Sequence, residues 1–171
     1  MPARGFLALA LVCLAAGAHS QPAPPPAELT LEQFLAQRGW SAVQLRENEF
    51  MQLEADVVLN GRHRMRVQIS TSFSKTVIDE AVAKALGLRV EPSGVEITGA
   101  RKQRLGTLRL ESLAFGDTRL GAATVFTADL PALLNRSGSA GAVQGVIGAD
   151  LLTKYQAVLE IPTATLYLRV R

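Results

Sequence analysis

Residues 57–88 read VVLNGRHRMRVQISTSFSKTVIDEAVAKALGL, and this stretch decides the fold. Apolar and polar residues alternate before Asn60-Gly61, from residue 51 to residue 59, and alternate again from residue 64 to residue 69. A period of two is typical of strands that bury one face. Asn-Gly between two such runs predicts a tight hairpin, because both residues tolerate the positive φ that the turn requires.

The same stretch continues through a turn rich in serine and threonine into a predicted helix. Between residues 77 and 86 the apolar positions recur at the spacing of one helix face. We expect Ser74 or Thr76 to cap this helix and Gly87 to end it. Another short helix is expected at residues 30–39, where a threonine and a glutamine have the spacing of a capping box.

The rest of the chain is expected to be mostly strand. Short runs with strand-like patterns lie at residues 95–98, 105–113, 122–128, 146–147, 157–161 and 165–170. Short helical segments are expected at 130–134 and 148–155. With the first helix and its connector at residues 30–48, this pattern predicts a single mostly-β domain at 49–171. We expect a closed barrel of one lobe with two or three short helices.

Residues 1–20 have the features of a secretory signal peptide. Arg4 supplies a positive start, residues 6–16 an apolar core and residues 18–20 a small-x-small cleavage site. The apolar run is shorter than the roughly 20 residues of a membrane-spanning helix. We therefore expect cleavage and a secreted or periplasmic protein with no membrane span, a retained anchor being the alternative. Residues 21–29 form a Pro-rich linker.

Composition narrows the classes of function. Cleavage after residue 20 removes Cys13, the only cysteine, and His19, so that His63 is the only remaining histidine. This excludes disulfides, thiol nucleophiles and cysteine metal sites, and we expect no metal and no organic cofactor. The loss of Arg4 lowers the formal net charge from +3 to +2, and aromatic residues make up 5% of the chain. Neither the low net charge nor the small share of aromatic residues favours nucleic-acid binding.

Two stretches give the chain a resemblance to a known family. The first is residues 57–88, where the turn reads ISTSFS at residues 69–74, and the second is GVIGADLL at residues 145–152. Together they resemble the retropepsin-like aspartic proteases, in particular the exported bacterial members with a single lobe. In that family the turn usually reads Val-Asp-Thr-Gly-Ala-Ser. The segment VEITGAR at residues 95–101 has the position of the family's flap, which folds over a bound peptide.

The resemblance implies that the catalytic motif is degenerate at Ser70, Thr71, Ser72 and Phe73. Aspartic proteolysis uses two carboxylates that share a proton and face one water, and a single-lobe dimer supplies one from each chain. Ser70 takes the place of that acid, and a serine hydroxyl is no base near neutral or acid pH. Ser72 replaces the family's glycine, Phe73 replaces a small residue, and Thr71 is retained. No catalytic residue is therefore expected in this motif.

The other acids and bases of the chain have expected roles outside catalysis. Asp79 and Asp150 are expected at helix starts, where an acid favours the helix dipole. Asp56 is expected on a solvated strand face. His63 is expected to be an exposed hairpin residue. The alternating arginines at residues 62, 64 and 66 share a face that is either solvated or a surface for an anionic partner.

The sequence therefore favours an exported protease-like domain that is inactive and binds a peptide or protein. The residues expected to contact that ligand are Thr98, Gly99, Ala100 and Arg101, in the flap-like segment. A homodimer, or a heterodimer with a related chain, is the expected assembly. The alternatives are an active aspartic endopeptidase that works with an Asp-bearing partner and a structural envelope protein.

Overall fold

The computed structural model describes residues 29–98, 102–134 and 143–170. Its helices are α1 (Leu31–Ala36), α2 (Glu80–Ala85), α3 (Leu130–Leu133) and α4 (Ala149–Lys154). Its strands are β1 (Trp40–Gln44), β2 (Arg46–Glu47), β3 (Leu53–Leu59), β4 (His63–Ile69), β5 (Val77–Asp79), β6 (Val90–Thr98), β7 (Lys102–Leu110), β8 (Leu113–Phe115), β9 (Thr118–Leu120), β10 (Ala123–Ala128), β11 (Gly145–Ile147), β12 (Val158–Glu160) and β13 (Thr165–Arg169). The predicted signal peptide, residues 1–20, lies outside the described residues. The predicted mostly-β fold is confirmed, whereas closure into a barrel stays a prediction.

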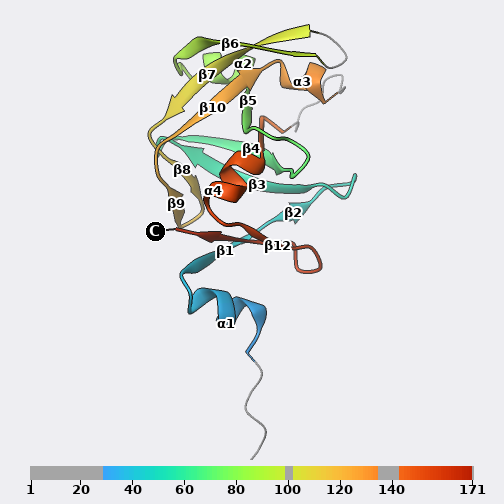
Figure 1. Cartoon of the computed structure of the whole chain (residues 1–171), viewed down its shortest axis with the longest axis vertical. Helices are drawn as coiled ribbons and strands as arrows, with labels where there is room; N and C mark the ends of the chain where they lie inside the picture. Colours follow the sequence, from blue (N-terminus) through green and yellow to red (C-terminus); the bar gives the residue numbers. More distant parts are fainter. Residues whose placement is uncertain (1–28, 99–101, 135–142, 171) are drawn as a thin grey trace, which may run out of the picture.

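The strands form two sheets. The larger sheet has the order β6-β7-β10-β5-β11-β4-β3-β8-β9, with β2 paired to β3, and the smaller has the order β1-β13-β12. In Figure 1 the β6–β7 hairpin lies at one end of the long axis and α1 at the other. Most neighbouring strands are antiparallel, but β10 runs parallel to β5 and β11 runs parallel to β4. On its other side, β11 is antiparallel to β5. This late strand therefore lies between the two strands that flank the Ser/Thr-rich turn.

The predicted Asn60-Gly61 hairpin is confirmed. Asn60 has φ 50° and Gly61 has φ 71°, and β3 pairs with β4 in antiparallel register on either side of them. The Asn60 side chain also accepts hydrogen bonds from the backbone amides of Glu111, at 2.8 Å, and Ser112, at 3.3 Å. These bonds bend the chain, so the single strand expected at residues 105–113 is divided between β7 and β8.

The expected start of the helix after the turn was wrong. Val77 and Ile78 begin a strand, β5, and the helix cap is Asp79 instead of Ser74 or Thr76. Two neighbouring strands explain the difference, since β5 pairs with β10 on one side and β11 on the other. Short apolar runs fit a buried strand and a helix face equally well, and only this tertiary pairing decides between them.

Two apolar clusters fill the interior. The larger one packs β3, β4, β7, β8 and β9 together, with fully buried side chains that include Val57, Leu59 and Leu110. The smaller cluster comprises Val77, Leu105, Ala128, Leu130 and Val146. It lies where the turn, α3 and the β6–β7 hairpin meet, so it links the turn to the flap-like hairpin.

The segment before β3 joins the fold through its own strand. The predicted capping box of α1 is confirmed by hydrogen bonds between Thr30 and Gln33 in both directions. After α1, the unpredicted strand β1 pairs with β13 along its whole length. Trp40 begins that strand and donates from its indole Nε1 to the backbone oxygen of Gln156 at 2.8 Å. This hydrogen bond anchors the start of β1 to the segment that follows α4.

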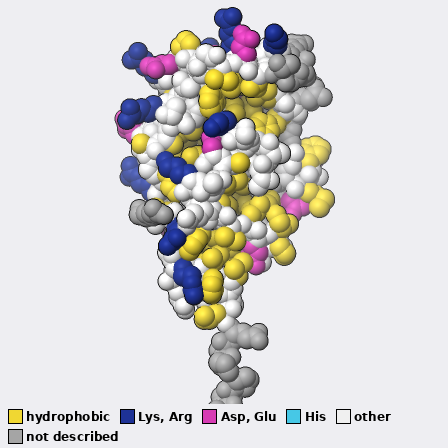
Figure 2. Space-filling view, viewed as in Figure 1, with side chains coloured by type: hydrophobic (Ala, Val, Ile, Leu, Met, Phe, Trp, Pro, Cys, Tyr) yellow, Lys and Arg dark blue, Asp and Glu magenta, His cyan; other side chains and the backbone are white. Residues whose placement is uncertain are grey.

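The outer surface is divided by side-chain type. Figure 2 shows Lys and Arg side chains mainly along one edge of the visible face, whereas hydrophobic side chains extend through its centre toward the other edge. Large exposed hydrophobic residues include Leu31, Phe34, Met51 and Ile161. Within the described ranges, no helix is long and apolar enough to cross a membrane.

Candidate functional site

The turn that joins β4 to β5 is held by the chain segment around β11. The backbone amide of Ser70 donates to the oxygen of Ile147 at 3.0 Å. At the other end of the turn, the amide of Ala149 donates to the oxygen of Phe73 at 2.7 Å. Parallel pairing of β4 with β11 aligns these groups. The sequence segments around residues 70 and 147 therefore meet.

At the centre of this turn lies a pair of alcohols. The Ser70 and Ser72 hydroxyl oxygens are 2.8 Å apart and share a hydrogen bond. Ser70 is half-buried, and Thr71 and Ser72 are exposed. Within the described part of the chain, no hydrogen bond joins the Ser70 hydroxyl to a carboxylate or to a histidine. His63 lies at the opposite end of β4, roughly 20 Å away along the strand. The pair can donate and accept hydrogen bonds, but it offers no group that takes a proton near neutral pH.

Directly behind the alcohol pair lies a hydrogen-bond network that we call the Thr76–Asp150 brace, formed by Thr76, Gly148 and Asp150. Asp150 Oδ1 accepts from the Thr76 amide at 2.9 Å, from the Thr76 hydroxyl at 2.7 Å and from the Leu151 amide at 2.8 Å. The Thr76 Oγ1 in turn accepts from the Gly148 amide at 3.0 Å. Thr76 is almost fully buried. Asp150 therefore secures the turn to the start of α4, a role beyond the expected interaction with the helix dipole.

Gly148 allows the two segments to approach this closely. A Cβ at this position would lie 2.5 Å from the carbonyl carbon and oxygen of Lys75 and 2.8 Å from the oxygen of Phe73. All three are backbone atoms, which cannot rotate away. Only glycine fits here without a shift of the backbone.

Asp79 is buried, and both of its carboxylate oxygens accept hydrogen bonds from backbone amides. Its Oδ1 accepts from the Val82 amide at 3.0 Å, which caps α2, and its Oδ2 accepts from the Leu130 amide at 3.1 Å, at the start of α3. The sequence predicted the interaction with one helix. It could not predict the second, because Leu130 is distant in sequence.

Phe73 packs against the smaller apolar cluster. The ring is half-buried and packs against that cluster together with Ile97 of β6 and with Leu133 and Leu134 of the α3 segment. The β6–β7 hairpin, which contributes Ile97 and Leu105, is the predicted flap. The ring therefore lies on the side of the turn that the flap strands cover.

The residues predicted to bind a ligand lie at the tip of this hairpin. Thr98 ends β6, and Thr98 pairs with Lys102 at the start of β7. Gly99, Ala100 and Arg101 lie outside the described residues, so their part in binding stays a prediction.

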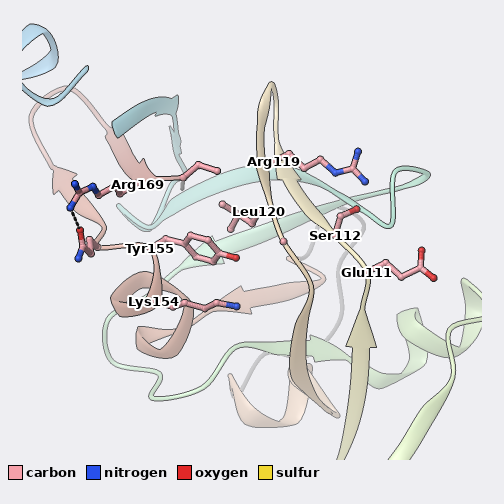
Figure 3. A pocket seen from close by; sticks show the side chains of 10 residues that line it. Glu111, Ser112, Arg119, Leu120, Lys154, Tyr155 and Arg169 are labelled. Carbon is pink, nitrogen blue, oxygen red and sulfur yellow. Dashed lines mark hydrogen bonds between the residues drawn. The ribbon is translucent and has the colours of Figure 1, made fainter. Parts of the chain in front are cut away.

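A separate hollow lies at the far end of α4 and was not predicted (Figure 3). It has a volume of about 630 Å³ and is lined by Glu111, Ser112, Arg119, Leu120, Gly121, Lys154, Tyr155, Gln156, Arg169 and Val170. It shares no lining residue with the turn. No local sequence pattern signals it, because its basic residues come from β9, α4 and β13.

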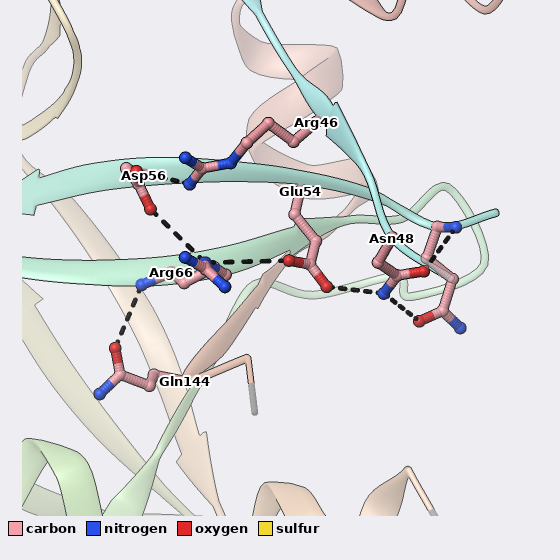
Figure 4. Close-up of polar contacts among 7 residues, drawn as sticks. Arg46, Asn48, Glu54, Asp56, Arg66 and Gln144 are labelled. Atoms are coloured by element: carbon pink, nitrogen blue, oxygen red, sulfur yellow. Dashed lines mark hydrogen bonds and ion pairs between the residues drawn. The ribbon is translucent and has the colours of Figure 1, made fainter. Parts of the chain in front are cut away.

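Of the alternating arginines at residues 62, 64 and 66, Arg66 belongs to an ion-pair network (Figure 4). Arg66 lies 3.6 Å from Asp56 and 3.9 Å from Glu54, and Arg46 forms a second ion pair with Asp56. Glu54 is buried and also accepts from the Asn48 side chain at 2.6 Å. Asp56 is thus exposed as expected, but it is paired and distant from the Ser70 turn.

No cluster of three or more metal-ligating side chains occurs among the residues that the structure describes. The candidate site at the turn combines an alcohol pair, a half-buried apolar ring and a hydrogen-bonded support. Such a site can hold a ligand through hydrogen bonds and apolar contact.

Comparison with known proteins gives one family match. The family model for aspartyl proteases matches residues 55–151. No curated protein matches the chain.

Several solved structures are similar in fold. A retropepsin-like aspartic protease from Rickettsia conorii is 14% identical, with a TM-score of 0.49 over 76% of this chain and 90% of that one. The retroviral protease-like domain of Ddi1 from Leishmania major is 12% identical, with a TM-score of 0.49 over 68% and 87%. The EIAV protease in complex with the inhibitor HBY-793 is 16% identical, with a TM-score of 0.49 over 67% and 98%.

Proposed function

This chain belongs to the aspartyl protease family, and we propose that it is a member that binds a peptide or protein without hydrolysing it. The observation that carries the proposal is the alcohol pair of Ser70 and Ser72 at the centre of the turn. Aspartic proteolysis needs a carboxylate there to take a proton from the attacking water. A serine hydroxyl remains protonated at the pH values where this family's chemistry operates, so the water keeps its proton.

The other acids near the turn support the same conclusion. Asp150 accepts three hydrogen bonds from Thr76 and Leu151, and Asp79 accepts two from backbone amides. Turning either carboxylate toward a water at Ser70 would break these bonds. Each buried donor left without a partner costs about 1–3 kcal/mol. Neither acid is therefore available as a substitute base.

Binding is supported by the parts of the site that remain. The turn offers hydroxyl groups at Ser70, Thr71 and Ser72, of which the last two are exposed. The flap-like hairpin packs against the same apolar cluster as Phe73. We propose that a peptide lies between this turn and the hairpin tip, where Thr98, Gly99, Ala100 and Arg101 contact it. A two-fold dimer, of this chain or with a relative, would complete the cleft.

We further propose that the protein acts outside the cytoplasm, in the periplasm or as a secreted protein. The support is the signal-like composition of residues 1–20. The mass of the protein recovered from its native host tests this proposal. A chain that begins at Gln21 supports it, and an intact chain that begins at Met1 contradicts it.

Restoration of the acid tests the catalytic part of the proposal. We expect no pepstatin-sensitive cleavage of a peptide pool by the wild-type chain. We expect slow cleavage by the triple variant Ser70→Asp/Ser72→Gly/Phe73→Ala, because it restores the family's motif on an intact support. The matched control is Ser70→Asn/Ser72→Gly/Phe73→Ala, which has nearly the same shape but no ionisable group. Cleavage by the wild-type chain would support the active-endopeptidase alternative.

Peptide enrichment tests the binding part. The wild-type chain should enrich a set of related peptides from a displayed library, and removal of residues 99–101 should abolish that enrichment without lowering the melting temperature of the rest of the domain. The control variant Arg64→Ala, on the outer face of β4, should retain it. A folded wild-type chain that enriches no peptide would favour the structural-protein alternative.

A further inference from the structure

The hollow at the end of α4 has an excess of positive charge. Arg119, Lys154 and Arg169 line it, against a single acid, Glu111. Among the described residues, none of the three cations forms an ion pair with a carboxylate. A concave surface lined by cations concentrates the positive potential and attracts anionic groups.

Internal contacts hold two of these cations in place. Arg169 donates from Nη1 to Gln156 Oε1 at 2.8 Å, and its guanidinium lies 4.6 Å from the centre of the Trp40 ring. Lys154 donates from Nζ to the backbone oxygen of Ala122 at 3.3 Å. All of these partners are neutral, so the positive charges remain unbalanced. Because the side chains are already positioned, binding would cost less side-chain entropy.

The spacing of the cations favours an extended ligand over a compact one. In Figure 3 the side chains of Arg169 and Arg119 lie toward opposite sides of the hollow, and Lys154 and Tyr155 lie between them. The cations do not converge on one point, as they would around a single phosphate. An extended chain that carries several negative charges matches this arrangement.

The lining also includes apolar groups. The half-buried Tyr155 ring and Val170 provide this apolar surface, and the buried Leu120 lies among the lining residues. Apolar side chains of a ligand can pack there and exclude water from the neighbouring charge pairs. A polypeptide can alternate acidic and apolar side chains along one strand, whereas a nucleic acid would present mostly phosphates and sugars to this surface.

We propose that this hollow is a second binding site, which takes an extended peptide segment that alternates acidic and apolar side chains. The proposal is independent of the function assigned to the Ser70 turn, because the two sites share no lining residue. A partner protein could then occupy this hollow with an acidic segment whether or not the turn binds a peptide.

Fluorescence anisotropy with a labelled synthetic peptide that alternates Glu and Leu tests the proposal on the full chain. The test variant is Arg119→Glu/Lys154→Glu, which reverses two charges of the hollow. The matched control, Arg89→Glu/Arg109→Glu, makes the same change in net charge at exposed positions outside it. Thermal melts of both variants establish that they fold. Amide chemical shifts of Tyr155 and Val170 report binding at the hollow itself.

We expect the test variant to bind the Glu-Leu peptide about tenfold more weakly than the wild-type chain, since two exposed charge pairs are lost and repulsion is added. The control should bind as wild type, and a peptide with Gln in place of Glu should not bind. Equal binding by the test variant, or unchanged shifts at Tyr155 and Val170, would overturn the proposed site. Tighter binding of a single-stranded oligonucleotide than of the peptide would overturn the proposed ligand class.

Discussion

The front and the back of the Ser70 turn have different chemistry. At the front lie the hydrogen-bonded hydroxyls of half-buried Ser70 and exposed Ser72, where we propose that the family's acid is missing. At the back, the Thr76–Asp150 brace joins the buried Thr76 to Asp150 and Gly148 through partly buried and buried hydrogen bonds, and Gly148 packs against backbone atoms. The brace stabilises the fold whether or not the front is reactive. If our proposal is right, the sequence can retain the support of an active site without its reactive group.

This contrast predicts that substitutions at the back destabilise the fold and substitutions at the front do not. The largest effect is expected for Gly148→Ala, which places a Cβ 2.5 Å from the carbonyl group of Lys75. We expect a loss of about 3 kcal/mol or more in the free energy of unfolding, measured by urea denaturation. Gly121→Ala is the control, because a Cβ there meets nothing within 4 Å. Equal stabilities of the two variants would show that the close approach at Gly148 is wrong.

The second effect concerns the acid of the brace. Asp150→Ala removes the acceptor of three hydrogen bonds and leaves the buried Thr76 amide without a partner. We expect a loss of about 2–3 kcal/mol in the free energy of unfolding. Asp150→Asn should lose less, because the amide oxygen can still accept. Asp117→Ala, at an exposed hairpin turn, should change stability by less than about 0.5 kcal/mol.

In the sequence, Phe73 lies between the alcohol pair and the brace. Its substitution tests how much the apolar contact of the turn contributes to stability. Phe73→Ala removes a half-buried ring from the smaller apolar cluster. We expect a loss of about 1–2 kcal/mol, less than for a fully buried phenylalanine. Phe73→Leu should retain most of the stability. If Phe73→Ala were as stable as the wild type, the ring would not contribute to the cluster.

The smallest effect is expected at the front. Ser70→Ala breaks only the hydrogen bond to the exposed Ser72. Its free energy of unfolding should stay within about 0.5 kcal/mol of the wild-type value. Urea denaturation in parallel with Asp150→Ala checks this. A loss as large as that of Asp150→Ala would mean that the front is part of the structural core.

Much of this architecture could be predicted from local patterns. The alternation around Asn60-Gly61 predicted the β3–β4 hairpin, because φ preference and burial act within a few residues. The Thr30 capping box and the end of α2 at Gly87, which has φ 69°, were predicted for the same reason. The prediction that Ser70 takes the place of the family's acid rests on the family resemblance instead.

Contacts between distant segments could not be predicted. The residues 77–79 form a strand only because β10 and β11 pair with them. The partnership of Thr76 with Asp150 joins positions 74 residues apart. The basic hollow likewise depends on how β9, α4 and β13 meet. The local spacing of residues carries no information on which distant segments contact each other.

We propose that the Ser70 turn has no group that activates water. The most direct test is incubation of the purified wild-type chain with a peptide pool in ¹⁸O-labelled water between about pH 3 and 7, a range that spans the titration of carboxyl groups. Mass spectrometry then detects ¹⁸O in any newly formed carboxyl terminus. We predict no incorporation above that of the peptides alone. Pepstatin-sensitive incorporation that disappears in the Ser70→Ala variant would contradict the account.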